Sequence, residues 1–280
     1  MNIQNETINT KRKLKVIDYP GEKGPIIALH GLTGNYLQLR HYVESLNQEY
    51  RVITLDFRGR GDSDSAENPS SIFEHANDIR NLIEEMKLDS PILMGYSMGG
   101  FVSSIVASIG IPIKALILLD GAATMSEHQI PIVEPTFGRL SKHYFSKEDY
   151  VATVTSSYMN MGIGITQELI KNVGYEVENK GDYWGNKSCE RTIRQDWKSF
   201  WEFDINSIGT KINCPTLLVE ATGNIGNNPP LFIPESYVNT KKSIRNLKIE
   251  ISEASHYTMV FEKREDINKF IHDFLNKLEN

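Results

Sequence analysis

Cysteine is scarce in this sequence of 280 residues, which contains two, Cys189 and Cys214. They form neither a C-x-x-C pair nor a zinc-type spacing, so we expect no metal ion held by thiolates. A disulfide between them is one alternative. Two free buried thiols in a reducing cytosol is the simpler interpretation.

Basic clusters and long apolar runs are also lacking. The formal net charge is -6, and the one basic cluster, Lys11 to Lys13, lies in a polar N-terminal segment that we interpret as a solvated tail. Nucleic-acid binding needs a basic stripe and is therefore not expected. No apolar run approaches the roughly 18 residues of a membrane helix, and residues 1–13 lack the apolar stretch of a secretory signal. We expect a cytoplasmic protein without a membrane partner, and a homodimer stays open.

Short apolar runs alternate with amphipathic segments along most of the chain. A helix is predicted over residues 72–86, where Ser71 and Glu74 offer a capping box, and two more over 98–109 and 266–278. The sequence therefore predicts an α/β fold, with a mostly parallel sheet and helices on both of its faces. The predicted strands span residues 25–30, 51–56, 91–96, 114–120, 215–220 and 247–252.

One long segment, residues 123–206, breaks this alternation. It has no apolar run typical of a buried strand, is rich in aromatic residues and contains all three tryptophans. We interpret it as a mainly helical cap. The cap is expected to interrupt a core domain formed by residues 1–122 and 207–280.

The sequence Gly95-Tyr96-Ser97-Met98-Gly99 has the pattern G-x-S-x-G, and it lies between a predicted strand and a predicted helix. This context is typical of a strained turn that exposes a nucleophilic serine, with small residues two places before and after it. The N–H of Met98 then points towards a bound carbonyl oxygen, at a helix N-terminus that favours negative charge. We predict Ser97 as the nucleophile.

A second glycine-containing motif, His30-Gly31-Leu32-Thr33-Gly34, follows the first predicted buried strand. The backbone N–H of Leu32 is the expected second donor of an oxyanion hole, beside that of Met98. His30 itself is interpreted as a structural hydrogen-bonding residue rather than a base.

His256 lies in the loop after the strand predicted over 247–252 and before the last helix. Neutral imidazole is suited to accept the proton of a serine hydroxyl at pH 7, so His256 is the predicted base. The other histidines are less favourably placed. We expect His41 and His75 on surface helices, His128 and His143 in the cap, and His272 in the final helix.

Together these motifs resemble the α/β-hydrolase superfamily. HGLTG, the turn from Asp56 to Ser63, the elbow GYSMGG and the loop of His256 occur in the order typical of that family, over nearly the whole chain. The resemblance is closest to the cap-bearing branch of serine hydrolases, with its dehalogenase-, lactonase- and esterase-like members. It implies that Asp56 and the RGRG turn are structural.

The sequence departs from the family pattern at the acid of the catalytic triad. In most of the family it follows the strand predicted here over 215–220, and the matching position is Asn224, which is no acid. Asp120, at the end of the strand over 114–120, is favoured, because some haloalkane dehalogenases and lactone hydrolases place their acid there. Glu220 is the alternative. Either would fix the tautomer of the base and stabilise its charged form.

These residues imply a serine hydrolase, of carboxylesterase or lactonase type, that acts through an acyl-enzyme without metal or cofactor. Because the nucleophile is a serine, dehalogenation is not expected. Two alternatives stay open: hydrolysis of a carbon–carbon bond in a diketone-like substrate, and a non-catalytic small-molecule receptor. The aromatic cap predicts an apolar small-molecule substrate. The candidate pocket residues are Met125, Phe137, Trp184 and Trp197.

Overall fold

The computed structural model describes residues 4–9, 13–66 and 69–279. Its main feature is an eight-stranded sheet with the strand order β1-β2-β4-β3-β5-β6-β9-β10. From β4 to β10 all neighbouring strands are parallel, whereas β1, β2 and β4 pair in antiparallel fashion. The strands are β1 (Gln4–Asn9), β2 (Lys13–Tyr19), β3 (Lys23–Leu29), β4 (Tyr50–Leu55), β5 (Ile92–Tyr96), β6 (Ala115–Leu119), β9 (Thr216–Gly223) and β10 (Leu247–Ser255).

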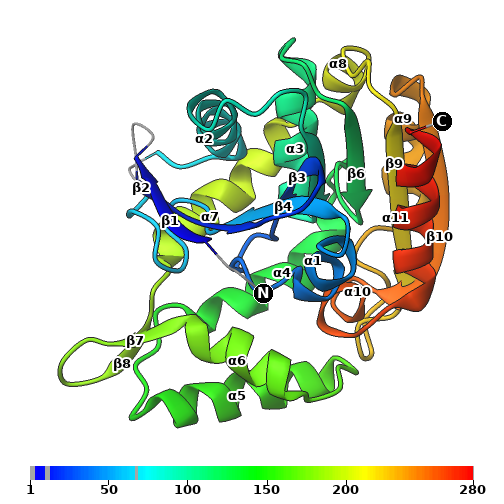
Figure 1. Cartoon of the computed structure of the whole chain (residues 1–280). Coiled ribbons are helices and arrows are strands. Elements are labelled where there is room, and N and C mark those ends of the chain that lie inside the picture. The colour runs from blue at the N-terminus through cyan, green and yellow to red at the C-terminus, as the bar shows by residue number, and fades with distance from the viewer. Residues whose placement is uncertain (1–3, 10–12, 67–68, 280) are drawn as a thin grey trace.

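Helices cover both faces of this sheet, as the sequence predicts (Figure 1). Alternate residues of one strand point to opposite faces. Ile27 of β3 packs with the helices α2 and α3, whereas its neighbour Ile26 packs with α1 and α11. These helices are α1 (Arg40–Leu46), α2 (Ile72–Glu85), α3 (Met98–Ser108) and α11 (Glu265–Lys277), and the shorter α9 (Val238–Ser243) and α10 (Thr258–Phe261) follow β9 and β10.

All six predicted strands are present, but the N-terminal segment is not the solvated tail that the sequence suggested. Lys13 begins β2, which pairs with β1 and β4. Leu14 and Val16 are fully buried, because this antiparallel strand turns alternate residues to the core. Lys11 and Arg12 lie outside the described residues.

Between β6 and β9 the chain is mainly helical, with one antiparallel hairpin, β7 and β8, that the sequence did not predict. Figure 1 shows α5, α6 and this hairpin apart from the sheet. The predicted boundary at residue 207 falls inside α8, which packs against α3 and α9 of the core. The elements are η1 (Glu127–Gln129), α4 (Ile130–Val133), η2 (Glu134–Arg139), α5 (Lys147–Asn160), α6 (Gln167–Tyr175), β7 (Val177–Asn179), β8 (Trp184–Asn186), α7 (Glu190–Ser199), η3 (Phe200–Glu202) and α8 (Ile205–Gly209).

Three further expectations concern exposure. Cys189 and Cys214 are both free thiols, but Cys189 is exposed and Cys214 half-buried, so the prediction of two buried thiols is wrong. His75 lies on a helix, as expected, yet it is fully buried rather than on the surface, because α7 packs against α2. Over the ranges described above, no helix is long and apolar enough to cross a membrane.

Candidate active site

Ser97 occupies a strained turn between β5 and α3. Its backbone has φ 51° and ψ -117°, a left-handed conformation that costs a non-glycine residue about 1–3 kcal/mol. The flanking glycines allow the turn to close. A Cβ at Gly95 would lie 2.1 Å from the carbonyl oxygen of Gly99, and a Cβ at Gly99 would lie 2.2 Å from that of Leu29. The G-x-S-x-G spacing is therefore a steric requirement of this turn.

Three parallel strands bring Ser97, Asp120 and His256 together at their carboxyl ends. Asp120 follows β6, and His256 follows β10. His256 Nε2 lies 3.1 Å from Ser97 Oγ, and His256 Nδ1 lies 2.6 Å from Asp120 Oδ2. With Nδ1 protonated towards the carboxylate, Nε2 is free to accept the proton of the serine hydroxyl.

Asp120 is held so that one of its oxygens faces His256. Its side chain is fully buried, and Oδ1 accepts hydrogen bonds from the N–H of Ala221 at 3.1 Å and the hydroxyl of Tyr237 at 2.8 Å. These two donors satisfy Oδ1 and leave Oδ2 for the imidazole. Tyr237 was not predicted from the sequence, because nothing local links it to β6.

The loop of His256 is tied to the elbow by Tyr96. The Tyr96 hydroxyl donates to the carbonyl oxygen of His256 at 2.8 Å, and the two rings pack with their centroids 4.8 Å apart. Tyr96 occupies the first variable position of the G-x-S-x-G motif, so the motif itself gave no signal for this contact. It couples the position of the base to the strand that carries the nucleophile.

Of the two predicted oxyanion donors, Leu32 lines the pocket beside Ser97, and Met98 is the residue that follows Ser97 in the chain. Within the described part of the chain, neither Leu32 N–H nor Met98 N–H donates a hydrogen bond to a protein group. Leu32 N–H shares a peptide unit with the carbonyl of Gly31, which accepts bonds from His30 Nδ1 at 2.7 Å and Gly34 N–H at 3.1 Å. Neither N–H group is therefore occupied by an acceptor among the described residues. The two bonds to the Gly31 carbonyl fix the orientation of the peptide unit that carries Leu32 N–H.

His30 is in the structural role that the sequence predicts. Its Nε2 accepts a hydrogen bond from Phe57 N–H at 3.1 Å, which requires Nδ1 to carry the proton that it donates to Gly31. Burial lowers the pKa of His30 to about 3. The ring is therefore neutral at pH 7, and its tautomer is fixed.

The alternative acid is engaged elsewhere. Glu220 Oε1 lies 2.8 Å from Lys241 Nζ, and no hydrogen bond joins Glu220 to His256 among the described residues. Asn224, the position that matches the usual acid of the family, is exposed. The geometry brings Asp120, and not Glu220, to the imidazole.

A pocket with about 560 Å³ of space between its atoms, part of it open to solvent, adjoins Ser97 and His256. Met125 and Trp197 line it, as expected. Phe137 does not line it; its fully buried ring packs against that of Trp197 instead, with the ring centroids 6.3 Å apart. Trp184 does not either, because it lies in β8 of the hairpin. The sequence did not single out the other large apolar residues of the lining, which are Phe101, Val133, Phe200, Leu231 and Phe232.

Comparison with known proteins agrees with this architecture. Residues 24–263 match the family model of the alpha/beta hydrolase fold. The chain therefore belongs to the α/β-hydrolase family, as its motifs predict.

Individual relatives are distant. Epoxide hydrolase 3 of Siraitia grosvenorii is 23% identical, covering 98% of this chain and 99% of that protein. Two matches of higher identity are local: mouse epoxide hydrolase 4 is 30% identical over 25% of that protein, and Bacillus subtilis YisY is 33% identical over 40% of that protein.

Two solved structures show the same fold over nearly the full length of both chains. E-2-(acetamidomethylene)succinate hydrolase has a TM-score of 0.84 and 18% identity, with 98% of each chain covered. An esterase from Thermogutta terrifontis has a TM-score of 0.70 and 18% identity, with 100% of each chain covered.

Proposed function

We propose that this protein is a serine hydrolase that cleaves a carboxylic ester or lactone of an uncharged, apolar small molecule. The observation that carries the proposal is the position of His256, within hydrogen-bond reach of Ser97 Oγ on one side and Asp120 Oδ2 on the other. A binding protein has no need of an imidazole that is oriented by a buried carboxylate and aimed at a strained serine.

The proposed reaction has two halves. His256 Nε2 takes the proton of Ser97 while Oγ bonds to the carbonyl carbon, and the electrons of the C=O bond move to its oxygen. The N–H groups of Leu32 and Met98 stabilise that charge. The tetrahedral intermediate then expels the alcohol, which leaves with the proton held by His256. Water, deprotonated by the same base, releases the acid and restores Ser97.

The lining of the pocket supports the substrate class. Its residues include apolar side chains from the core and from the segment 123–206, and no Lys, Arg, Asp or Glu is among those described. A charged acyl group would lose its hydration there without gaining a partner, which is unfavourable. We therefore expect an uncharged acyl chain, and we do not expect the dicarboxylate named for E-2-(acetamidomethylene)succinate hydrolase.

Turnover of p-nitrophenyl esters with acyl chains of two, four and eight carbons tests the proposal. The wild type should hydrolyse at least one ester, with a clear preference among the lengths, and Ser97→Ala should be inactive. Ser103→Ala is a control, because Ser103 is a buried serine of the adjoining helix α3 whose hydroxyl has no hydrogen-bond partner among the described residues. Titration of acid released from γ- and δ-lactones separates the two bond types. No hydrolysis of any ester or lactone by the folded wild type contradicts the proposal.

A further inference from the structure

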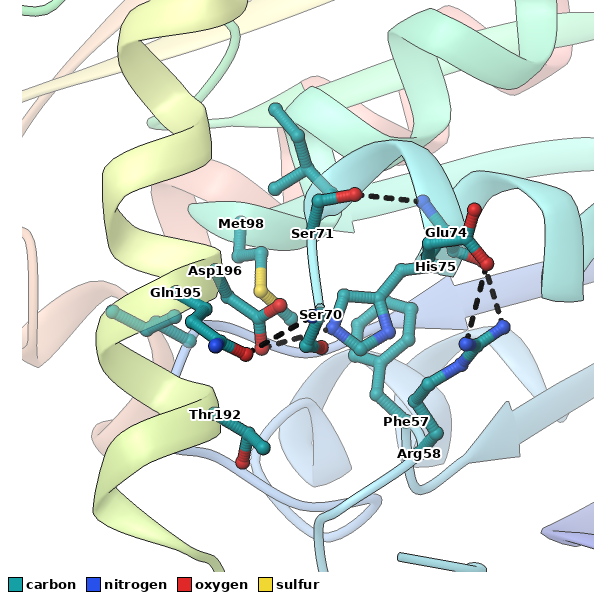
Figure 2. Close-up of polar contacts among 12 residues, drawn as sticks. Phe57, Arg58, Ser70, Ser71, Glu74, His75, Met98, Thr192, Gln195 and Asp196 are labelled. Carbon is teal, nitrogen blue, oxygen red and sulfur yellow. Dashed lines mark hydrogen bonds and ion pairs between the residues drawn. The ribbon is translucent and has the colours of Figure 1, made fainter. Parts of the chain in front are cut away.

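A second group of buried ionisable side chains lies outside the triad, where α7 meets the core. Arg60 follows β4 and Asp196 belongs to α7, and neither side chain is exposed to solvent. Arg60 Nη2 lies 2.6 Å from Asp196 Oδ2, and His75 Nε2 of α2 lies 3.1 Å from the same oxygen. Figure 2 shows Asp196 directed from α7 towards His75.

The guanidinium of Arg60 also forms hydrogen bonds with the loop that carries Leu32. Its Nε and Nη2 donate to the carbonyl oxygen of Leu32 at 3.1 and 3.0 Å, and Nη1 donates to that of Arg58 at 3.1 Å. Two donors on a rigid planar fork fix the direction of a carbonyl better than a single flexible donor does. With the Gly31 carbonyl held by His30, both peptide units that flank the Leu32 Cα are constrained.

The cluster contains one positive and one negative charge, those of Arg60 and Asp196. Arg58 is occupied by Asp78 and Glu74, so it does not compete for Asp196. Burial lowers the pKa of His75, which therefore stays neutral at pH 7. Burial alone would raise the pKa of Asp196, but Arg60, His75 and Ser70 together outweigh burial and hold that pKa below its ordinary value. Arg60 and Asp196 are thus one buried cation facing one buried anion.

The helix that supplies Asp196 also supplies part of the pocket wall. The next residue, Trp197, lines the pocket. The same helix is docked on the segment before α2, because Ser70 N–H donates to Gln195 Oε1 at 3.1 Å and Ile72 N–H donates to Ser199 Oγ at 3.0 Å. The position of α7 against the core therefore determines the positions of both Trp197 and Asp196.

Stability alone is a weak reason for such a pair. The cost of desolvating two buried charges offsets most of their attraction, and apolar residues of equal volume often stabilise a protein as well. An apolar pair, however, could not donate hydrogen bonds to the Leu32 carbonyl. The position of the cluster, between the loop of Leu32 and the pocket wall, therefore points to a role other than stability.

We propose that Arg60 is a positioning residue for the oxyanion hole, and that Asp196 holds Arg60 in place so that the hole is complete only when α7 is seated. The inference rests on the proposed function for its catalytic consequence. Its structural part, the coupling of Asp196 through Arg60 to Leu32, stands apart from any activity. Substrate contacts with Trp197 that seat α7 then also order the Leu32 peptide.

Arg60→Lys and Asp196→Asn test the coupling with two readouts. The first is the backbone amide signal of Leu32 in protein labelled with ¹⁵N-leucine, which needs no turnover. Both variants should shift or broaden that signal. The second is ester hydrolysis, where kcat should fall about 10- to 100-fold with KM within about twofold, less than the 10²–10³ lost when an oxyanion donor is removed outright. In the double variant the two losses should not add, because both act through one contact.

Glu190→Gln is the matched control, because it removes another carboxylate of α7, one that pairs with Arg194 of the same helix and not with Arg60, and it should leave the Leu32 signal in place. Arg60→Lys keeps a buried cation for Asp196, and Asp196→Glu keeps the anion, so folded variants are available if Asp196→Asn unfolds. An unmoved Leu32 signal in folded Arg60→Lys overturns the inference. Absence of hydrolysis by the wild type overturns the proposed function instead, while the amide signal still decides the coupling.

Discussion

Replacing Asp120 by asparagine should stop turnover by reversing the tautomer of His256. Ala221 N–H and Tyr237 O–H both donate to Oδ1, so the atom at that position must be an acceptor. The amide oxygen of asparagine will therefore occupy the position of Oδ1. The NH₂ group then lies where Oδ2 lies now, 2.6 Å from His256 Nδ1. It can only donate, so Nδ1 must be unprotonated and the proton must move to Nε2. An Nε2–H cannot accept the proton of Ser97.

The expected loss is about 10⁴ in kcat, the size seen for the same change in a serine protease triad, or about 5 kcal/mol of transition-state stabilisation. Because asparagine and aspartate have the same shape, the fold and KM should change little. Steady-state hydrolysis of the best p-nitrophenyl ester at pH 7.5 measures the loss, and circular dichroism checks the fold.

Glu220→Gln is the matched control. It removes the alternative acid, which is paired with Lys241, and should keep kcat within a few-fold of wild type. If folded Asp120→Asn stays within tenfold of wild type while Glu220→Gln is inactive, the assignment of the acid is refuted.

Three further predictions concern the elbow, the base and acid stability. Gly99→Ala places a methyl group 2.2 Å from the carbonyl oxygen of Leu29 and should lower the melting temperature and abolish hydrolysis; an active, equally stable variant contradicts this. Tyr96→Phe removes the 2.8 Å bond to the His256 carbonyl and should lower kcat by about tenfold with KM unchanged. A rise of about tenfold in KM with kcat unchanged would count against a positioning role. The pKa of His30 is lowered from 6.5 to about 3, so between these values the unfolded chain binds a proton that the folded chain does not. Urea titrations at pH 7.5 and 5.5 should therefore show the free energy of unfolding falling by about 1.4 kcal/mol through His30 alone, and no fall is the contrary result.

The parts of the fold that could be predicted from sequence are those with a local signature. Buried parallel strands such as 91–96 are continuous apolar runs, and the elbow at Ser97 needs glycines at fixed spacing. β2 was missed because a strand with one solvated face alternates polar and apolar residues and is easily confused with a polar tail. β7 and β8, at three residues each, are too short to give a periodic signal.

Long-range contacts could not be predicted in the same way. His75 lies on a helix whose pattern is readable, but its burial depends on α7, more than a hundred residues further along the chain. Phe137 and Trp197 are both aromatic residues of one segment, yet only Trp197 lines the pocket. Which face an aromatic side chain presents is set by how the helices of this segment dock, and composition does not carry that information.

The activation of Ser97 is the central claim, and mass spectrometry of the intact protein after treatment with a fluorophosphonate tests it most directly. The wild type should gain the mass of one adduct, which peptide mapping should place on Ser97, and Ser97→Ala should gain none. His256→Ala should react at least about 10³-fold more slowly, because the serine then has no base. A folded wild type that forms no adduct, or one that reacts equally well without His256, would contradict the account.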